Sequence, residues 1–365
     1  MNTATNVNLP TPDFSFPEPF RCVAGLRPFR KDGYRLEVDR SAASSGKFLV
    51  HNYGHGGAGI TLSWGSASQV RDLVRAHLAT STDRKVAVLG SGVMGLTVAI
   101  LLLELGLEVT IYAKQFWSDT TSAIAGGQWA VSKVDHPNAA QFKDIVEVSY
   151  RTFKDSIGKG FGVSDRPNYA TASGSPNLDI VLQISPGLIP PPQRLPRLPF
   201  EHHTKPGWVY QTLLVEPPIF LKRLDDDLRA RNVPFVTRTF STVADVLALQ
   251  ENIIVNCTGL GSKKIWNDQQ LQPIKGQLAL LPGQPALNYL YGQNGYMFPR
   301  TDVVVIGGSF ELDFTTTDPD PDFCKLLVDY MKGQFGKGPE IPLPDIHIHH
   351  PDNLPKAAPG AIAVA

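Results

Sequence analysis

The stretch from residue 85 to 114, KVAVLGSGVMGLTVAILLLELGLEVTIYAK, most constrains how this chain of 365 residues can fold. An apolar strand over 85–90 runs into a glycine turn, an apolar helix over 93–106 follows, and a second apolar strand covers 107–114. Two parallel strands joined by a helix form a β-α-β unit, whose sheet is covered by helices. The sequence therefore predicts an α/β fold with a Rossmann-type parallel sheet.

The glycine turn of this unit, GSGVMG, predicts a site for the phosphates of a dinucleotide. The first glycine makes the turn, the second lets a pyrophosphate approach the backbone, and the third lets the helix pack on the strand. The start of the helix would then face the phosphates. The alternative is a purely structural turn. The residues expected to bind the cofactor here are Gly90, Gly92, Val93, Met94 and Gly95.

Two later stretches favour FAD over NADP as the dinucleotide. Lys114 occupies the position where an acidic ribose ligand is usual, so it either faces the 2′-phosphate of NADP or is simply solvated. The stretch TTSAIAGGQW resembles the segment by which flavin oxidases cover the pyrophosphate and the flavin edge, and NCTG resembles the second glycine turn of that cofactor fold. These stretches, with one aromatic between them, add the expected FAD ligands Thr120, Thr121, Ser122, Gly126, Gly127, Gln128, Phe240, Thr258 and Gly259.

A second glycine-dense turn lies close by, at residues 51–65, which read HNYGHGGAGITLSWG. Glycines leading into a helix-like run are typical of a backbone that approaches a ligand. An amphipathic helix is expected over 66–79, because Val70, Leu73, Val74 and Leu78 fall at helical spacing.

The other expected elements are shorter. Residues 132–200 are expected to be less regular, with a proline-rich surface loop at 186–200. Strands are expected over 20–30, 34–40, 47–54, 233–238, 252–259, 276–282 and 296–310, and helices over 217–233, 243–250 and 322–335.

Together with GYMFPR, VVVIGGSF and GLRPFR, these motifs resemble the D-amino-acid oxidase family of FAD enzymes. The resemblance covers most of the chain, except the first twenty residues, the loop at 186–200 and the tail after Pro339. It implies a Rossmann-type FAD domain and a substrate domain with a mainly antiparallel sheet. We expect an FAD-binding domain over 27–130 and 217–267, and a substrate domain over 1–26, 131–216 and 268–365.

The order of the motifs departs from that family. Segments like GLRP and HNYGHGG close the family's chain, whereas here they precede GSGVMG. The resemblance therefore predicts a circular permutation with its joint at TSTDR, residues 80–84. Such a rearrangement is tolerated when the two original ends are neighbours.

The resemblance also implies the roles of single residues. Arg27 would bind the substrate carboxylate through two parallel donors, and Tyr296 would donate a further hydrogen bond; for each, the alternative is a structural side chain. No catalytic role is expected for His51 or His55. The residues expected to contact the flavin ring are Gly56, Gly57, Gly59, Ile60 and Thr61.

The implied activity is that of an amino-acid oxidase. A hydride would pass from the substrate α-carbon to flavin N5, the imino acid would hydrolyse, and oxygen would reoxidise the flavin and yield hydrogen peroxide. Two departures from the family pattern leave alternative functions open. Gly292, beside Tyr291, stands where the family often has a lid tyrosine, and Ala58 replaces an aromatic residue. These favour a specialised flavin amine oxidase or dehydrogenase on a decorated substrate, while Lys114 leaves open a non-catalytic FAD-fold protein.

Composition excludes other partners. Lys plus Arg and Asp plus Glu both number 34, so nothing indicates a nucleic-acid or membrane partner. The three cysteines and the tail motif HIHHP lack the spacing or partners of a metal site. The N-terminal residues do not resemble a signal peptide, so a cytoplasmic enzyme acting on a small amino acid or amine and oxygen is expected.

Overall fold

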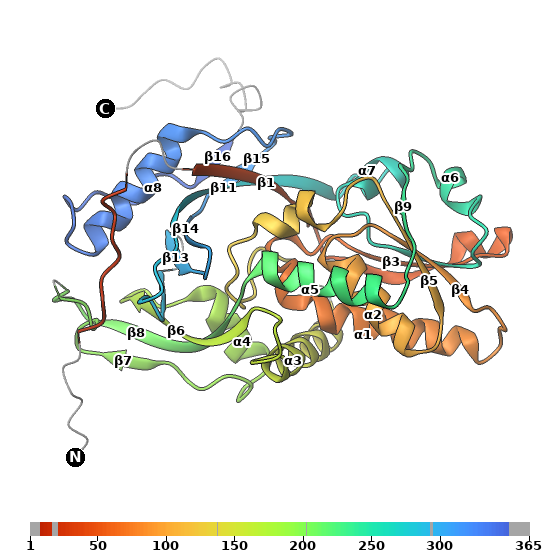
Figure 1. Cartoon of the computed structure of the whole chain (residues 1–365), viewed down its shortest axis with the longest axis horizontal. Coiled ribbons are helices and arrows are strands. Elements are labelled where there is room, and N and C mark those ends of the chain that lie inside the picture. The colour runs from red at the N-terminus through yellow and green to blue at the C-terminus, as the bar shows by residue number, and fades with distance from the viewer. Residues whose placement is uncertain (1–7, 17–20, 137, 202, 293–294, 350–365) are drawn as a thin grey trace, which may run out of the picture.

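The computed structural model describes residues 8–16, 21–136, 138–201, 203–292 and 295–349. In this part of the chain, strands form two sheets that lie beside each other (Figure 1). One is a mostly parallel sheet with helices on both faces, and the other is mainly antiparallel. The predicted fold class is confirmed.

The parallel sheet is the Rossmann-type one. Its strand order is β2, β3, β10, β4, β5, β9, and only the β2–β3 pair is antiparallel. In chain order, its strands are β2 (Arg35–Asp39), β3 (Phe48–Tyr53), β4 (Lys85–Leu89), β5 (Glu108–Ala113), β9 (Phe235–Thr237) and β10 (Ile253–Asn256).

Both faces of this sheet are buried, which explains its continuous apolar strands. Val86 and Val88 of β4 pack into the larger core, which α1 (Gly59–Leu78), α2 (Val93–Glu104) and α5 (Pro217–Ala230) cover. Ala87 and Leu89 point the other way, into a core with α6 (Val243–Leu247) and α7 (Gly261–Ile265). The two helical layers are visible in Figure 1.

The second sheet runs in the order β16, β15, β11, β14, β13, β12, β6, β8, β7, and β1 also pairs with β11. Two of its neighbouring pairs are parallel, β6–β12 and β15–β16. Its strands are β1 (Arg21–Arg30), β6 (Val163–Thr171), β7 (Gln193–Leu195), β8 (Gly207–Val215), β11 (Leu271–Pro282), β12 (Leu290–Gly292), β13 (Tyr296–Pro299), β14 (Val303–Gly307), β15 (Phe310–Leu312) and β16 (His347–His349).

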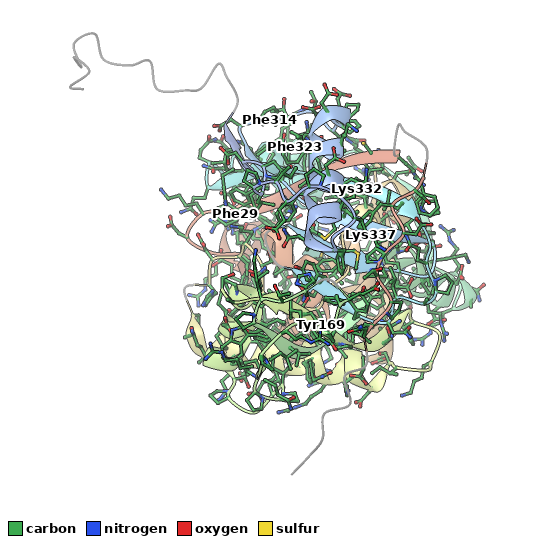
Figure 2. All side chains as sticks on the ribbon, turned by 90° about the vertical axis from the view of Figure 1, so that its left-hand side faces the viewer. Phe29, Tyr169, Phe314, Phe323, Lys332 and Lys337 are labelled. Atoms are coloured by element: carbon green, nitrogen blue, oxygen red, sulfur yellow. The ribbon has the colours of Figure 1, made fainter. Side chains whose placement is uncertain are left out.

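Helix α8 (Pro321–Gln334) covers part of this sheet. It buries Phe323, Leu327 and Met331 in a core shared with β11 and β14. Figure 2 shows this end of the molecule, with α8 above Tyr169 of β6. The tail beyond residue 349, which includes the end of the HIHHP motif, lies outside the described residues.

The segment 132–200 is more regular than predicted. It contains α3 (Ala139–Asp155), then β6, then α4 (Pro176–Ile184), and β7 interrupts the proline-rich loop. Helix α3 begins after Asn138, whose side chain accepts a hydrogen bond from the Gln141 N–H. It packs against α1 and so belongs to the main core.

The N-terminal part of the chain contributes to both sheets. Strand β1 pairs with β11 along ten positions, from Arg21 opposite Leu280 to Arg30 opposite Leu271. Strand β3 lies between β2 and β10 in the Rossmann-type sheet. The proposed domain boundary at residue 27 therefore falls inside β1.

Helix α1 leads through residues 79–84 into β4, where the joint of the predicted permutation was expected. It begins at Gly59, seven residues before the predicted start, because the run that follows the glycine turn at 56–58 is already helical.

Candidate functional site

A cavity of about 1120 Å³ lies between the two sheets. Its walls include the loops that follow the carboxyl ends of β4, β5 and β10, which is where open α/β sheets bind ligands. Residues of β1, β11 and β13 form its other side. The volume exceeds the usual range of about 300–1,000 Å³ for drug-sized ligands, so the cavity has room for a dinucleotide.

The turn after β4 exposes the start of α2 to this cavity. Gly90 has a φ of 103°, and a side chain there would meet the Cys257 carbonyl. Gly92, the N-cap residue of α2, has no side chain that could accept from the first backbone N–H groups of the helix. Such groups can donate to a ligand instead. One of them, at Val93, donates to the Ser122 hydroxyl (3.2 Å).

Gly95 has a structural position instead. A Cβ there would fall on the Gly90 carbonyl, and Gly95 is not among the described residues that line the cavity. It lets α2 pack against the turn, as expected of the third glycine. Its inclusion among the cofactor ligands stays untested.

The second glycine turn places the start of α1 beside the start of α2. A Cβ on Gly59 would lie 3.9 Å from Val93 Cγ1 and 4.0 Å from Met94 Cε. Gly56 has a φ of 54°, and a Cβ there would fall on the Lys133 carbonyl. Two helix N-termini therefore face one cavity, and both favour negative charge.

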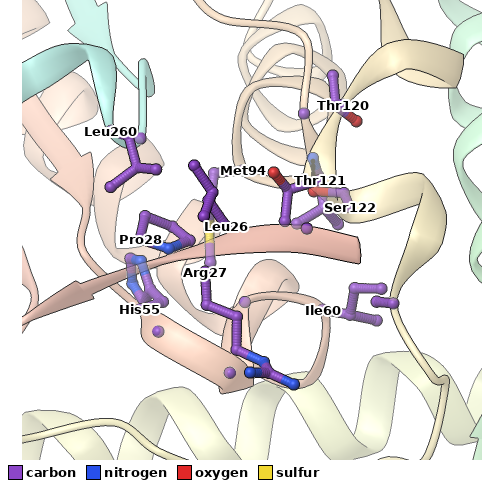
Figure 3. A pocket seen from close by; sticks show the side chains of 18 of the residues that line it. Leu26, Arg27, Pro28, His55, Ile60, Met94, Thr120, Thr121, Ser122 and Leu260 are labelled. Atoms are coloured by element: carbon purple, nitrogen blue, oxygen red, sulfur yellow. Dashed lines mark hydrogen bonds between the residues drawn. The ribbon is translucent and has the colours of Figure 1, made fainter. Parts of the chain in front are cut away.

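The segment after β5 closes the cavity over these helices. Thr120, Thr121 and Ser122 lie together on one side of the cavity (Figure 3). Gly126 lies against Phe298, whose ring would have to shift slightly for a larger residue, while Gly127 packs on the Val215 carbonyl with a φ of 116°.

The ends of β5 and β10 form the part of the cavity that would hold the adenosine. Lys114 lines it but is exposed to solvent. Phe240 is buried, with the Arg238 guanidinium 4.9 Å from its ring centroid. Thr258 donates its hydroxyl to Asn256 Oδ1 (2.8 Å), which holds the turn that contains Gly259.

Three buried polar atoms in the cavity wall have no hydrogen-bond partner among the described residues. They are Asn52 Oδ1, His55 Nδ1 and Gln128 Nε2. Leaving a buried polar atom unpaired costs about 1–3 kcal/mol, so such atoms indicate a polar ligand. Donors and acceptors of this kind in the cavity wall fit a cofactor with polar edges, such as FAD.

His55 faces this region in its neutral form. Burial lowers its pKa to about 3, its Nε2 lies 3.1 Å from Ser66 Oγ, and its ring stacks on Tyr34. His51 does not line the cavity, within the described set. It is held between Asp39 and Asn256 (3.1 and 3.0 Å), and burial lowers its pKa to about 4.

Arg27 lies on β1 and points away from Thr120 in Figure 3. Its Nη1 donates to the Ser309 carbonyl (3.0 Å) and more weakly to that of Lys275 (3.4 Å). The guanidinium lies over Gly276, where any Cβ would overlap it. The glycine therefore creates the space for the arginine, and the carbonyls fix its plane.

Tyr296 begins β13 beside this arginine. Its ring lies over Gly307 and Gly308 and stacks on Phe298, with centroids 4.3 Å apart. Burial raises the pKa of Tyr296, although the hydrogen bond and charge of Arg27 oppose the rise. The phenol therefore keeps its proton and can donate it to a carboxylate.

The structure brings the predicted site residues together. The described lining of this cavity includes Arg27, Tyr296, Gly56, Gly57, Gly59, Ile60, Thr61, Gly90, Gly92, Val93, Met94, Thr120, Thr121, Ser122, Gly126, Gly127, Gln128, Phe240, Thr258 and Gly259. Their individual roles remain predictions, because the cavity shows proximity and not binding.

The two departures that suggested a modified pocket lie elsewhere. Ala58 is fully buried in the main core. Tyr291 is buried under α8 and donates to Gln334 (3.2 Å). Neither of them, nor Gly292, is among the described lining residues.

Among the lining side chains absent from the predicted site are three polar ones, Asn52, His55 and Lys133. The first two lie inside HNYGHGG, where a buried polar residue beside glycines was a usable signal. Nothing in the sequence near Lys133 indicated its position.

Within the described residues, no group of three or more His, Cys, Asp or Glu side chains is placed to hold a metal ion. Nor does any helix there combine the length and apolarity needed to cross a membrane.

Comparisons with known proteins agree with this geometry. The family DAO, FAD dependent oxidoreductase, matches residues 85–350. A D-amino-acid oxidase of Streptomyces coelicolor is 25% identical over 272 residues, which cover 67% of this chain and 76% of that one. A D-aspartate oxidase of Homo sapiens is 24% identical, with coverage of 67% and 74%.

Among solved structures, a glycine oxidase of Bacillus cereus has a TM-score of 0.51 at 17% identity, and the match covers 68% of this chain and 78% of that one. At this identity the likeness supports the fold.

Proposed function

Since this chain belongs to the family of FAD dependent oxidoreductases, we propose that it is an FAD-dependent oxidase of amino acids. Its cofactor is FAD. The curated relatives are named D-amino-acid oxidase and D-aspartate oxidase, and this supports the D enantiomers as substrates.

We propose that two glycine turns hold the cofactor from two sides. The N-terminus of α2 and the hydroxyls of Thr121 and Ser122 would hold the pyrophosphate, and the N-terminus of α1 would face the flavin ring. Asn52 and His55 would supply the ring with hydrogen bonds that the protein itself leaves unmade. When bound, FAD supplies the two-electron chemistry: it takes a hydride from the substrate and is reoxidised by oxygen, which becomes hydrogen peroxide.

The observation that carries the substrate class is the pairing of Arg27 with Tyr296. A guanidinium and a protonated phenol lie together in the wall of the cavity that would hold the cofactor. Both are donors, and a carboxylate is the ligand that accepts from both. Arg27 and Tyr296 would orient the substrate, because a fixed carboxylate also fixes the position of the α-hydrogen relative to the flavin.

The test is a flavin spectrum followed by a substrate panel. Purified protein should show flavin absorption, either as isolated or after FAD is added. With oxygen present, it should release hydrogen peroxide from some D-amino acids, and the matching L-amino acids should serve as controls. Flavin without turnover of any amino acid would refute the proposed substrate class.

An assay with an artificial electron acceptor distinguishes an oxidase from a dehydrogenase, the main alternative. If amino acids reduce the flavin but oxygen does not reoxidise it, the protein is a dehydrogenase and not an oxidase. Should the protein bind no FAD at all, the enzyme proposal fails as a whole.

The permuted order of the chain remains a proposal. It is supported by the family match, which begins at Lys85, the first residue of β4. The segments with GLRP and HNYGHGG precede that point. A gene in which residues 85–365 precede residues 1–84 should therefore still give an FAD-binding protein, and an insoluble product from that gene alone would count against the permutation.

A further inference from the structure

The wall of the cavity near Arg27 carries a second positive charge, on Lys133. The one carboxylate in the described lining is Asp119. It precedes Thr120, which lies on the other side of the cavity from the Arg27 guanidinium (Figure 3). The end of the cavity that would receive the substrate is therefore positive.

The backbone of Lys133 is fixed against the second glycine turn. Lys133 has a φ of 52°, a left-handed conformation that costs a non-glycine residue some energy. Its carbonyl accepts a hydrogen bond from the Gly57 N–H (3.2 Å) and fills the space that a side chain at Gly56 would need. The backbone of Lys133 therefore has a defined position beside the expected flavin site.

The side chains of Lys133 and Arg27 both reach the beginning of β15. Lys133 Nζ lies 4.6 Å from the ring centroid of Phe310. The preceding residue, Ser309, accepts the hydrogen bond from Arg27 Nη1 (3.0 Å). Two cations from distant segments thus reach two consecutive residues at the start of β15.

No carboxylate among the described residues pairs with either cation. Burial and the positive charge of Arg27 both lower the pKa of Lys133, so the two groups repel each other. Like charges held together in this way are relieved by a ligand with negative charge. One carboxylate would satisfy Arg27 and Tyr296, and it would leave Lys133 without a counter-ion.

We propose that Lys133 determines substrate specificity by binding a second carboxylate, so that the preferred substrates are acidic amino acids. Arg27 and Tyr296 hold the α-carboxylate, and Lys133 holds the carboxylate of the side chain. This inference rests on the proposed function. Its chemistry is that of a charge-assisted hydrogen bond from an ammonium to a carboxylate.

Kinetics on paired substrates test the proposal. For the wild type, kcat/KM for D-aspartate or D-glutamate should exceed that for D-asparagine or D-glutamine, which have the same shape without the charge. Lys133→Met should lower this acidic-to-amide ratio by about tenfold or more. Lys159→Met is the matched control, because Lys159 is exposed and lies outside the described lining. An unaltered ratio in Lys133→Met would overturn the proposal.

Two more variants separate charge from shape. Lys133→Arg should keep most of the acidic preference, and Lys133→Glu should reverse it in favour of D-lysine or D-arginine. Flavin absorption confirms that each variant is folded and loaded. If Lys133→Met instead lowers kcat/KM equally for acidic and amide substrates, Lys133 serves the α-carboxylate and the proposal is wrong.

A binding measurement keeps this inference separate from the proposed oxidase activity. Carboxylates that are not substrates can be titrated into the FAD-loaded protein and followed by the change in flavin absorption. Succinate should bind at least about tenfold more tightly than butyrate, and Lys133→Met should remove the difference. Equal affinities in the wild type would refute the second site. A protein that prefers succinate but oxidises no amino acid would refute the oxidase function alone.

Discussion

A Cβ placed on Gly59, the first residue of α1, would lie 3.9 Å from Cγ1 of Val93, the first residue of α2. The two helices therefore begin side by side, although each follows a different strand of the parallel sheet. This contact explains why one chain has two glycine turns so close in sequence. Both turns serve a single cavity, and each brings backbone N–H groups to it.

Alanine substitutions should separate the glycine that faces the ligand from the glycine that packs. Gly59 has helical angles and ordinary contact distances, so Gly59→Ala should leave the free energy of unfolding of the FAD-free protein unchanged or raise it by up to about 1 kcal/mol. The added methyl should still weaken FAD binding by about tenfold. Gly95→Ala should lower the free energy of unfolding by about 1–3 kcal/mol, because its Cβ falls on the Gly90 carbonyl.

Denaturant unfolding without FAD and fluorescence titration with FAD measure the two effects. Equal losses of stability in Gly59→Ala and Gly95→Ala would contradict the assignment.

Arg27→Ala should remove most of kcat/KM, about 3–5 kcal/mol of transition-state stabilisation, because a buried charged contact to the substrate is lost. Flavin absorption should persist, since the residue lies at the substrate end. Peroxide release under initial-rate conditions is the measurement. Wild-type kinetics on every carboxylate substrate would rule out the proposed role of Arg27.

Tyr296→Phe should raise KM and have a smaller effect on kcat. The ring would keep its stacking on Phe298 and its place over Gly307, and only the hydroxyl donor would be lost. A hydrogen bond to a charged group contributes about 1.5–3 kcal/mol, so kcat/KM should fall by roughly 10- to 150-fold. Because burial raises the pKa of Tyr296, wild-type binding should not weaken through ionisation of this tyrosine within the usual range of tyrosine titration. If kcat/KM of the variant stays within twofold, the phenol is a packing residue.

The protein should lose stability as the pH falls below about 6.5, the usual pKa of an unfolded histidine. Burial lowers the pKa of His51 to about 4 and that of His55 to about 3 in the folded state. Between these values and 6.5 the unfolded chain binds more protons, so acidification favours unfolding. At pH 5 each histidine should cost about 2 kcal/mol relative to neutral pH.

Urea unfolding of the wild type and of His51→Gln at neutral pH and at about pH 5 measures this. The variant should lose about 2 kcal/mol less between the two conditions. The same loss in both proteins would show that His51 does not titrate in this way.

Local pattern was sufficient for the Rossmann-type half of the fold. The β-α-β unit follows from one uninterrupted apolar stretch and its glycines, and the structure has β4, α2 and β5 there. Helix α3 was missed, although Phe142, Ile145, Val146 and Phe153 form an apolar stripe at helical spacing. The prolines and polar residues around it obscured this stripe.

The sequence predicted those lining residues that lie within one local motif. It did not predict residues that only strand pairing or a distant contact brings to the cavity. The glycines of GSGVMG and HNYGHGG predicted a close approach of backbone to a ligand, and both motifs line the cavity. Arg27 and Tyr296 came from a family resemblance, since their proximity depends on the pairing of β1 with β11 and of β13 with β14. Lys133 depends on a contact between its carbonyl and Gly57, more than 70 residues earlier, and no local pattern encodes that contact.

The pairing of the first strands with late ones also governs when the enzyme can fold. Phe48 of β3 pairs with Ile253 of β10, and Arg21 of β1 pairs with Leu280 of β11. At a synthesis rate of about 5–20 residues per second, a separation of about 200 residues corresponds to roughly 10–40 s. We expect the cofactor cavity to be completed only after β11 has left the ribosome, and protease protection of residues 21–53 in shorter nascent chains would disprove this. Until then, the edges of the earliest strands remain unpaired. Slow translation would therefore prolong the time during which these edges can aggregate.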